Sequence, residues 1–285
     1  MKTYLDCYPC FLRQALQAAR LAGGTEAQQQ AVVGGVLEVL VQMGADSTPP
    51  EIADQVHQLV RREVRNGDPY QTAKQAATQQ ALQLYPRLKA RVAGADDPLE
   101  VALRLSIAGN IMDLGPELHY DLWDTVERVL AQPFAVDDSA ALRQALATAR
   151  SVLYLTDNAG ETVFDRVLIE TLAAPVTVAA KGGPILNDAT CNDAVEAGLD
   201  QIAELISTGT DAPGVILSRC SDAFRARFEE ADVVLAKGQA NYETLSPGDA
   251  RVFFLLRAKC PVIARDLGTE AGAIVVRQGD AGGRL

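Results

Sequence analysis

The chain has 285 residues, of which 48% are hydrophobic, 22% charged and 5% aromatic, and its formal net charge at pH 7 is -11. This size and composition exclude a disordered protein and allow one large α/β domain, or a catalytic domain with a smaller helical one. The negative charge, without a local cluster of Lys and Arg, argues against nucleic acid as a partner, because nucleic-acid binding depends on cationic side chains that neutralise phosphates.

The N-terminal segment and the cysteine content bear on localisation. Asp6 interrupts the apolar run that a signal peptide needs, and no apolar stretch approaches the roughly 18 residues of a membrane-spanning helix. Five cysteines, an odd number spread over a large chain, are typical of a reducing compartment and not of a disulfide scaffold. We therefore expect a cytoplasmic protein without a membrane partner.

Cys7 and Cys10 open the first predicted helical segment. Because they are three residues apart, their thiols would share one face of a helix. They could form half of a metal or redox site that Cys260 or another residue completes. They could equally pack as small hydrophobic side chains, since Pro9 stands between them and no second C-x-x-C occurs. The sequence leaves both interpretations open.

The pattern of apolar residues changes near residue 150. Up to that point, helix-forming residues with apolar positions three and four apart predict a mainly helical domain over 1–148. From residue 151, short apolar runs alternate with helical segments, which is typical of βαβ units. The predicted strands are 151–155, 176–180, 201–206, 233–236, 251–256 and 274–276. We expect a three-layer, Rossmann-like α/β/α domain over 149–285.

Polar residues follow the first of these strands, at a position where open α/β sheets bind ligands. Asp157 and Asn158 supply a carboxylate and an amide oxygen, which are hard ligands suited to Mg²⁺ or Mn²⁺. A helix-capping Asp-Asn turn explains the same pair equally well. This pair alone does not decide between the two interpretations.

Two further strands end in similar residues. Asp188 follows the strand at 176–180 and adds a second carboxylate, although an Asn-Asp turn is again an ordinary explanation. Lys237 follows the strand at 233–236, where it can meet a phosphate as a point charge, and Gly238 permits close approach of the backbone. Carboxylates, amides and a lysine at three strand ends together favour a functional site.

These motifs, in this order and spacing, resemble the damage-control phosphatase family, also called the ARMT-like family and formerly known as domain of unknown function 89. The resemblance covers essentially the whole chain. It rests on Cys-Tyr-Pro-Cys at 7–10, Ala-Gly-Asn-Ile-Met-Asp at 108–113, Asp-Asn-Ala-Gly-Glu at 157–161, Asn-Asp at 187–188 and Lys-Gly-Gln-Ala-Asn-Tyr-Glu at 237–243. The cysteine pair places the chain with the smaller, cysteine-bearing branch.

The resemblance implies a helical domain packed on a Rossmann-like domain and a divalent-metal-dependent phosphatase. It assigns the metal to three residues: Asp157, Asn158 and Asp188. It makes Lys237 a phosphate-binding residue, so that Asp157, Asp188 and Lys237 are the expected catalytic groups. It assigns substrate contacts to five further residues: Asn110, Asp113, Glu161, Gly238 and Asn241.

The predicted reaction is hydrolysis of a phosphorylated small metabolite, such as a sugar phosphate, a nucleotide or a cofactor precursor, with Mg²⁺ or Mn²⁺ as cofactor and Co²⁺ or Ni²⁺ as further candidates. We favour direct attack by water over a covalent aspartyl phosphate, because Asp157 lacks the second Asp two residues on that usually serves as acid and base. The alternatives are a Rossmann-like methyltransferase and a non-catalytic metal- or nucleotide-binding module.

Overall fold

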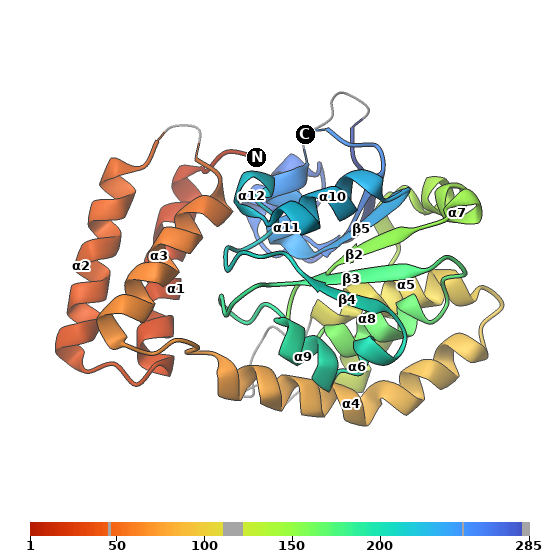
Figure 1. The fold of residues 1–285 in the computed structure, drawn as a ribbon, viewed down its shortest axis with the longest axis horizontal. Coiled ribbons are helices and arrows are strands. Elements are labelled where there is room, and N and C mark those ends of the chain that lie inside the picture. Colours follow the sequence, from red (N-terminus) through yellow and green to blue (C-terminus); the bar gives the residue numbers. More distant parts are fainter. Residues whose placement is uncertain (45–46, 111–121, 247, 281–285) are drawn as a thin grey trace.

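The computed structural model describes residues 1–44, 47–110, 122–246 and 248–280. A seven-stranded sheet lies at its centre, with helices on both faces, and helices α1 to α3 stand beside it (Figure 1). The strands are β1 (Phe134–Asp137), β2 (Val152–Leu155), β3 (Val176–Ala180), β4 (Glu204–Ser207), β5 (Val233–Lys237), β6 (Val252–Arg257) and β7 (Ile274–Gln278). Within the described residues, no helix is long and apolar enough to cross a membrane.

The helices fall into three groups by position. The N-terminal group comprises α1 (Tyr8–Leu21), α2 (Glu26–Gln42) and α3 (Pro49–Val64). The second group precedes β2 and comprises α4 (Gln71–Ala93), α5 (Pro98–Ala108), α6 (Leu122–Ala131) and α7 (Ser139–Thr148). The third group alternates with the strands and comprises α8 (Thr162–Ile169), α9 (Cys191–Glu196), α10 (Asp222–Glu230), α11 (Gly238–Leu245) and α12 (Pro261–Asp266), with the short 3₁₀ helices η1 (Leu5–Cys7), η3 (Leu199–Gln201) and η4 (Leu217–Arg219).

The strand order is β1-β7-β6-β5-β2-β3-β4, and neighbouring strands are parallel except β6 and β7. Alternate residues of each central strand enter opposite cores. Tyr154 packs in a core with α4, α5 and α8, whereas Leu153 packs with α10, α11 and α12. Because both faces are buried, the strands are uninterrupted apolar runs in the sequence. The predicted three-layer α/β/α class is confirmed.

Strand β1 was not predicted from the sequence. It is an edge strand whose side chains alternate between half-buried and exposed, so it lacks the apolar run that marked the other strands.

The predicted domain boundary at residue 148 does not separate the helices from the sheet. Strand β1 lies before that boundary and yet pairs with β7 in the sheet. Helices α1 to α3 enclose their own core, around Phe11, Val36 and Val56, whereas α4 to α7 contribute apolar side chains to the sheet core. The division between cores therefore falls near residue 70 and does not coincide with the predicted boundary at 148.

The N-terminal helices contact loops that follow β3 and β4. Arg61 of α3 donates hydrogen bonds of 2.8 Å to the Pro184 carbonyl and to Asp211. Asp54, also on α3, forms a 2.7 Å ion pair with Arg219. Both loops leave the carboxyl ends of parallel strands, so α3 lies over the edge of the sheet where ligands bind in this class of fold.

Candidate active site

Three neighbouring strands deliver the predicted site residues to one edge of the sheet. Strand β2 lies between β5 and β3, and Leu155 pairs with Ala179 on one side and with Ala236 on the other. The residues that follow these strand ends therefore meet. Asp157, Asn158, Asp188 and Lys237 are all buried, with exposed fractions of 5, 3, 4 and 0%.

Backbone pairing holds Asp157, Asn158 and Asp188 together. Asn158 and Asp188 form an isolated antiparallel bridge, and the Asp157 carbonyl accepts a 2.8 Å hydrogen bond from the amide of Ala189. The Asn187 carbonyl accepts a 2.9 Å hydrogen bond from the amide of Ala159. The loop after β3 thus lies against the segment after β2, so the three predicted metal ligands are close neighbours along the paired backbones.

Glycines permit two close approaches in this region, one to Asp157 and one to helix α4. Gly238, at the start of α11, has a φ of +77°, and a Cβ atom there would lie 2.1 Å from Asp157 Oδ2. At Gly160 an added Cβ would lie 2.9 Å from the Cβ of Ala77 on α4. Any side chain at these positions would displace the carboxylate or the helix. The two glycines in the motifs therefore have a packing reason to be there.

Lys237 occupies the centre of the site and is fully buried. Its ammonium donates to Glu161 Oε1 at 2.5 Å, to Asp165 Oδ1 at 2.6 Å and to the Ser106 carbonyl at 2.9 Å. A lysine has three donor hydrogens, so these acceptors account for all of them. Burial lowers the pKa of Lys237, but the two carboxylates more than offset this, and the net shift is upward. The side chain is therefore positively charged near neutral pH.

Glu161 links the lysine to the predicted metal site. Its Oε1 accepts from Lys237, while its Oε2 accepts from Asn158 Nδ2 at 2.9 Å and from Asn110 Nδ2 at 3.2 Å. Asn158 Nδ2 also donates to Asp157 Oδ2 at 3.0 Å. One chain of hydrogen bonds therefore runs from Asn110, just after the end of α5, through Glu161 and Asn158 to Asp157.

Asp165 was not among the residues predicted to form the site. Its Oδ1 accepts hydrogen bonds from Lys237, from Tyr154 Oη at 2.8 Å and from Ser106 Oγ at 2.9 Å. Burial raises its pKa to about 6, against the opposing charge of Lys237. A signal was present, since Asp165 follows Glu161 by four residues and so faces the same side of α8. Tyr154 and Ser106 carried no such signal.

The remaining predicted residues are placed as follows. Asn241 donates from Nδ2 to the Lys237 carbonyl at 2.7 Å and to the Thr156 carbonyl at 3.2 Å, and so ties the start of α11 to the end of β2. Its Oδ1 is buried and, among the described residues, has no hydrogen-bond partner. Asp113 lies outside the described residues.

Comparison with known proteins identifies the family. A family model described as the damage-control phosphatase ARMT1-like domain matches residues 3–275. The chain belongs to this family. A damage-control phosphatase of Pyrococcus horikoshii is 35% identical over 96% of this chain and 97% of its own length. A damage-control phosphatase of Archaeoglobus fulgidus is 35% identical over 97% of this chain and 99% of its own length. The resemblance predicted from the motifs is confirmed.

A solved structure supports the fold of this ARMT1-like domain. The crystal structure of a DUF89 family protein from Pyrococcus horikoshii matches with a TM-score of 0.90 at 33% identity. The match covers 98% of this chain and all of that chain. The arrangement of sheet and helices in Figure 1 is therefore that of a family member over nearly its whole length.

The chemistry of the donor set fits a hard divalent cation. Asp157 and Asp188 supply carboxylate oxygens, and Asn158, whose Nδ2 is already used as a donor, keeps its amide oxygen as a ligand. Among the described residues, no three His, Cys, Asp or Glu side chains form a group that could hold a metal ion. The predicted ligand set of this ARMT1-like domain therefore combines two carboxylates with the amide oxygen of Asn158.

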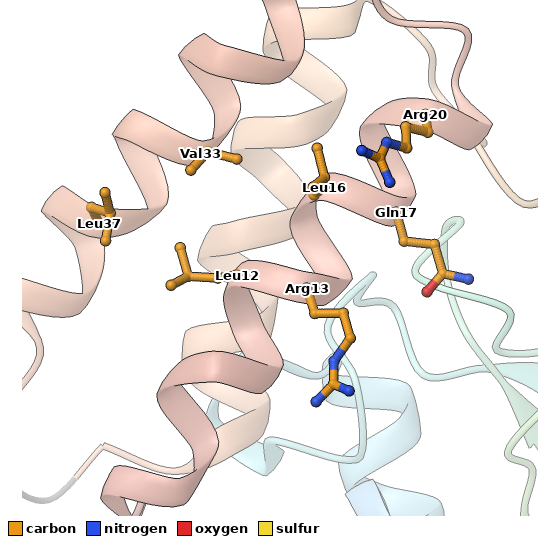
Figure 2. A pocket seen from close by; sticks show the side chains of 7 residues that line it. All are labelled: Leu12, Arg13, Leu16, Gln17, Arg20, Val33 and Leu37. Atoms are coloured by element: carbon orange, nitrogen blue, oxygen red, sulfur yellow. The ribbon is translucent and has the colours of Figure 1, made fainter.

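A separate groove of about 480 Å³ lies between α1 and α2 (Figure 2). Its lining is mainly aliphatic, with two arginines, and consists of Leu12, Arg13, Leu16, Gln17, Arg20, Val33 and Leu37. It has no carboxylate and no residue from a strand end. This groove is therefore not part of the candidate site of the ARMT1-like domain.

Proposed function

We propose that the chain is a divalent-metal-dependent phosphatase that hydrolyses a phosphate monoester of a small metabolite. The observation that carries the proposal is the backbone pairing that brings Asp157, Asn158 and Asp188 together beside the buried cation Lys237. Membership of the damage-control phosphatase family supports the reaction class. The five cysteines are free thiols, which suits a cytoplasmic location.

Asp157, Asn158 and Asp188 would hold the ion. When bound, a divalent ion supplies positive charge that stabilises the phosphoryl group in the transition state. Mg²⁺ and Mn²⁺ suit these oxygen ligands best, and Co²⁺ and Ni²⁺ are further candidates. The two carboxylates together match the charge of such an ion, so the buried site becomes close to neutral when it is loaded.

Lys237 has two roles in this proposal. Through Glu161 it orients Asn158, since Glu161 accepts hydrogen bonds from both side chains. It also brings a positive charge close to the proposed position of the phosphoryl group. A direct contact with a phosphoryl oxygen requires Lys237 to exchange one of its three present acceptors, because all its donor hydrogens are used.

A second buried cation lies on the other side of the site. Lys181, at the end of β3, has its ammonium 3.5 Å from Asp188 Oδ2 and also donates to the Gly214 carbonyl. Lys181 and Lys237 therefore lie beside the two neighbouring strand ends that flank β2. In our proposal, they offset the negative charge of substrate and ligands from both sides.

The test is a phosphatase screen over sugar phosphates, nucleotides and phosphopantetheine-type metabolites, with each of the four metals and with a chelator. We expect phosphate release that requires metal and that Asp157→Ala reduces by about 100-fold or more, as loss of a central electrostatic group does. Asp200→Ala is the matched control, because it removes an exposed carboxylate in η3, and it should retain activity. Full activity with chelator, or in Asp157→Ala, would refute the proposal. Methyl transfer without a metal would favour the alternative class.

A further inference from the structure

Three thiols outside the candidate site surround the start of α1. Cys7 is the N-cap of α1, Cys10 lies in its first turn, and Cys260 is the N-cap of α12. The segment before α1 contacts α12 directly, because Arg265 lies 3.6 Å from Asp6. The proposed phosphatase reaction uses none of these residues.

The backbone geometry of Cys7 and Cys10 suits a disulfide. Cys7 has φ of -77° and ψ of -24°, so it continues the helical path of α1. Two helical residues three apart have Cα atoms about 5 Å from each other, which lies within the disulfide range of about 4.4–6.8 Å. Their side chains also share one face. Both thiols are partly exposed, so a small oxidant can reach them.

The surroundings favour the disulfide over the ionised dithiol. Burial raises the pKa of both Cys7 and Cys10. A backbone hydrogen bond from Tyr4 to Cys7 and the charge of Arg13 near Cys10 offset this in part, whereas Glu243 and Cys260 raise both pKa values further, and the net shift of each is upward. Gln239 connects these two neighbours, since it donates to Glu243 Oε1 at 2.8 Å and to Cys260 Sγ at 3.8 Å. In strongly oxidising cysteine pairs, a low thiol pKa stabilises the reduced form. Cys7 and Cys10 lack this stabilisation, so their disulfide is favoured by comparison.

We propose that Cys7 and Cys10 form a reversible dithiol–disulfide pair that exchanges with low-molecular-weight disulfides. The thiolate of one cysteine attacks a sulfur of the external disulfide and releases one thiol. The other cysteine then attacks the mixed disulfide and releases the second thiol. The protein pair loses two electrons and two protons, and the external disulfide gains them as it becomes two thiols. The inference does not depend on the phosphatase reaction.

The test equilibrates the full-length, fully reduced protein with mixtures of reduced and oxidised glutathione. Free thiols are then alkylated and counted by intact mass, and linked peptides are mapped. We expect two of the five thiols to disappear together and the linkage to map to Cys7 and Cys10. The initial rate should rise about tenfold per pH unit below the thiol pKa, because the thiolate is the nucleophile.

Matched variants separate this pair from the other thiols. Cys191→Ser removes a partly exposed thiol elsewhere and should leave the linkage unchanged. Cys7→Ser should instead leave Cys10 as a mixed disulfide with glutathione, and Cys10→Ser should do the same to Cys7. Circular dichroism checks that each variant is folded. If Cys10→Ser does not fold, Cys10→Ala replaces it in the same experiment.

Three outcomes would overturn the proposal. The first is a protein that keeps five alkylatable thiols at every glutathione ratio. The second is a linkage that maps to another pair of cysteines. The third is a metal ion bound stoichiometrically to the purified protein and lost in Cys10→Ser, which would make the thiols ligands of a metal centre.

Discussion

The ammonium of Lys237 donates a 2.6 Å hydrogen bond to Asp165 Oδ1, and neither side chain is accessible to solvent. Glu161 forms a second ion pair with the same ammonium at 2.5 Å. One buried cation is therefore shared by two buried carboxylates. Removal of the cation would leave two negative charges close together in a region of low dielectric, which is strongly unfavourable.

Lys237→Met should lower the free energy of unfolding by about 3–5 kcal/mol, the cost of removing one partner of a buried pair. Urea unfolding near neutral pH measures it. Lys89→Met is the matched control, because Lys89 pairs with Glu170 at 2.9 Å but is 52% exposed. We expect less than about 1 kcal/mol there. Equal losses in the two variants would contradict the central role of Lys237.

Gly238→Ala should impair both activity and metal binding. The added Cβ would lie 2.1 Å from Asp157 Oδ2, so the carboxylate must move, and the φ of +77° adds backbone strain. Gly268→Ala is the control, since Gly268 has a φ of +67° with nothing within 4 Å of an added Cβ. It carries the strain without the clash. Activity measured in both variants separates the backbone strain from the clash. Equal activity in the two variants would show that the clash with Asp157 does not impair the enzyme.

Asp188→Asn should weaken Mn²⁺ binding by at least about tenfold. Mutation of residues that only hydrogen-bond to a metal ligand already costs about 10–100-fold in metal affinity, and loss of a ligand should cost no less. The change keeps the shape of the side chain but removes a negative charge. Titration calorimetry measures the affinity directly, without a substrate. Asp211→Asn alters a carboxylate that pairs with Arg61 and should leave the affinity unchanged. Unaltered Mn²⁺ binding in Asp188→Asn would remove this residue from the proposed ligand set.

Ionisation of Glu243 should lower the free energy of unfolding as the pH rises from about 4.5 to about 7. Burial raises its pKa from 4.5 to about 7, so within this window the folded state binds more protons than the unfolded state. Stability therefore falls through the window, by on the order of 3 kcal/mol. Urea unfolding at both ends of the window should show a smaller fall for Glu243→Gln, whereas the exposed Glu230→Gln should follow the wild type. Identical profiles for Glu243→Gln and wild type would refute this.

Most of the sheet could be predicted from sequence because its signals are local. The strand at 176–180 was predicted with the bounds that β3 has, and each of the other predicted strands overlaps an observed one. Strand β1 was missed because an edge strand is not buried on both faces and carries no continuous apolar run. Helical periodicity likewise predicted helices before residue 150, but it does not say against which core a helix packs.

The sequence by itself determined the family, the three-layer class and the placement of Asp157, Asn158, Asp188 and Lys237 at strand ends. These follow from apolar runs and short motifs, which are properties of neighbouring residues. Only the tertiary structure decided what surrounds the lysine. Ser106 comes from α5, Tyr154 from β2, Asp165 from α8 and Lys237 from β5. Their contacts depend on how the sheet and helices pack, and no local pattern of charge or periodicity encodes such long-range pairs.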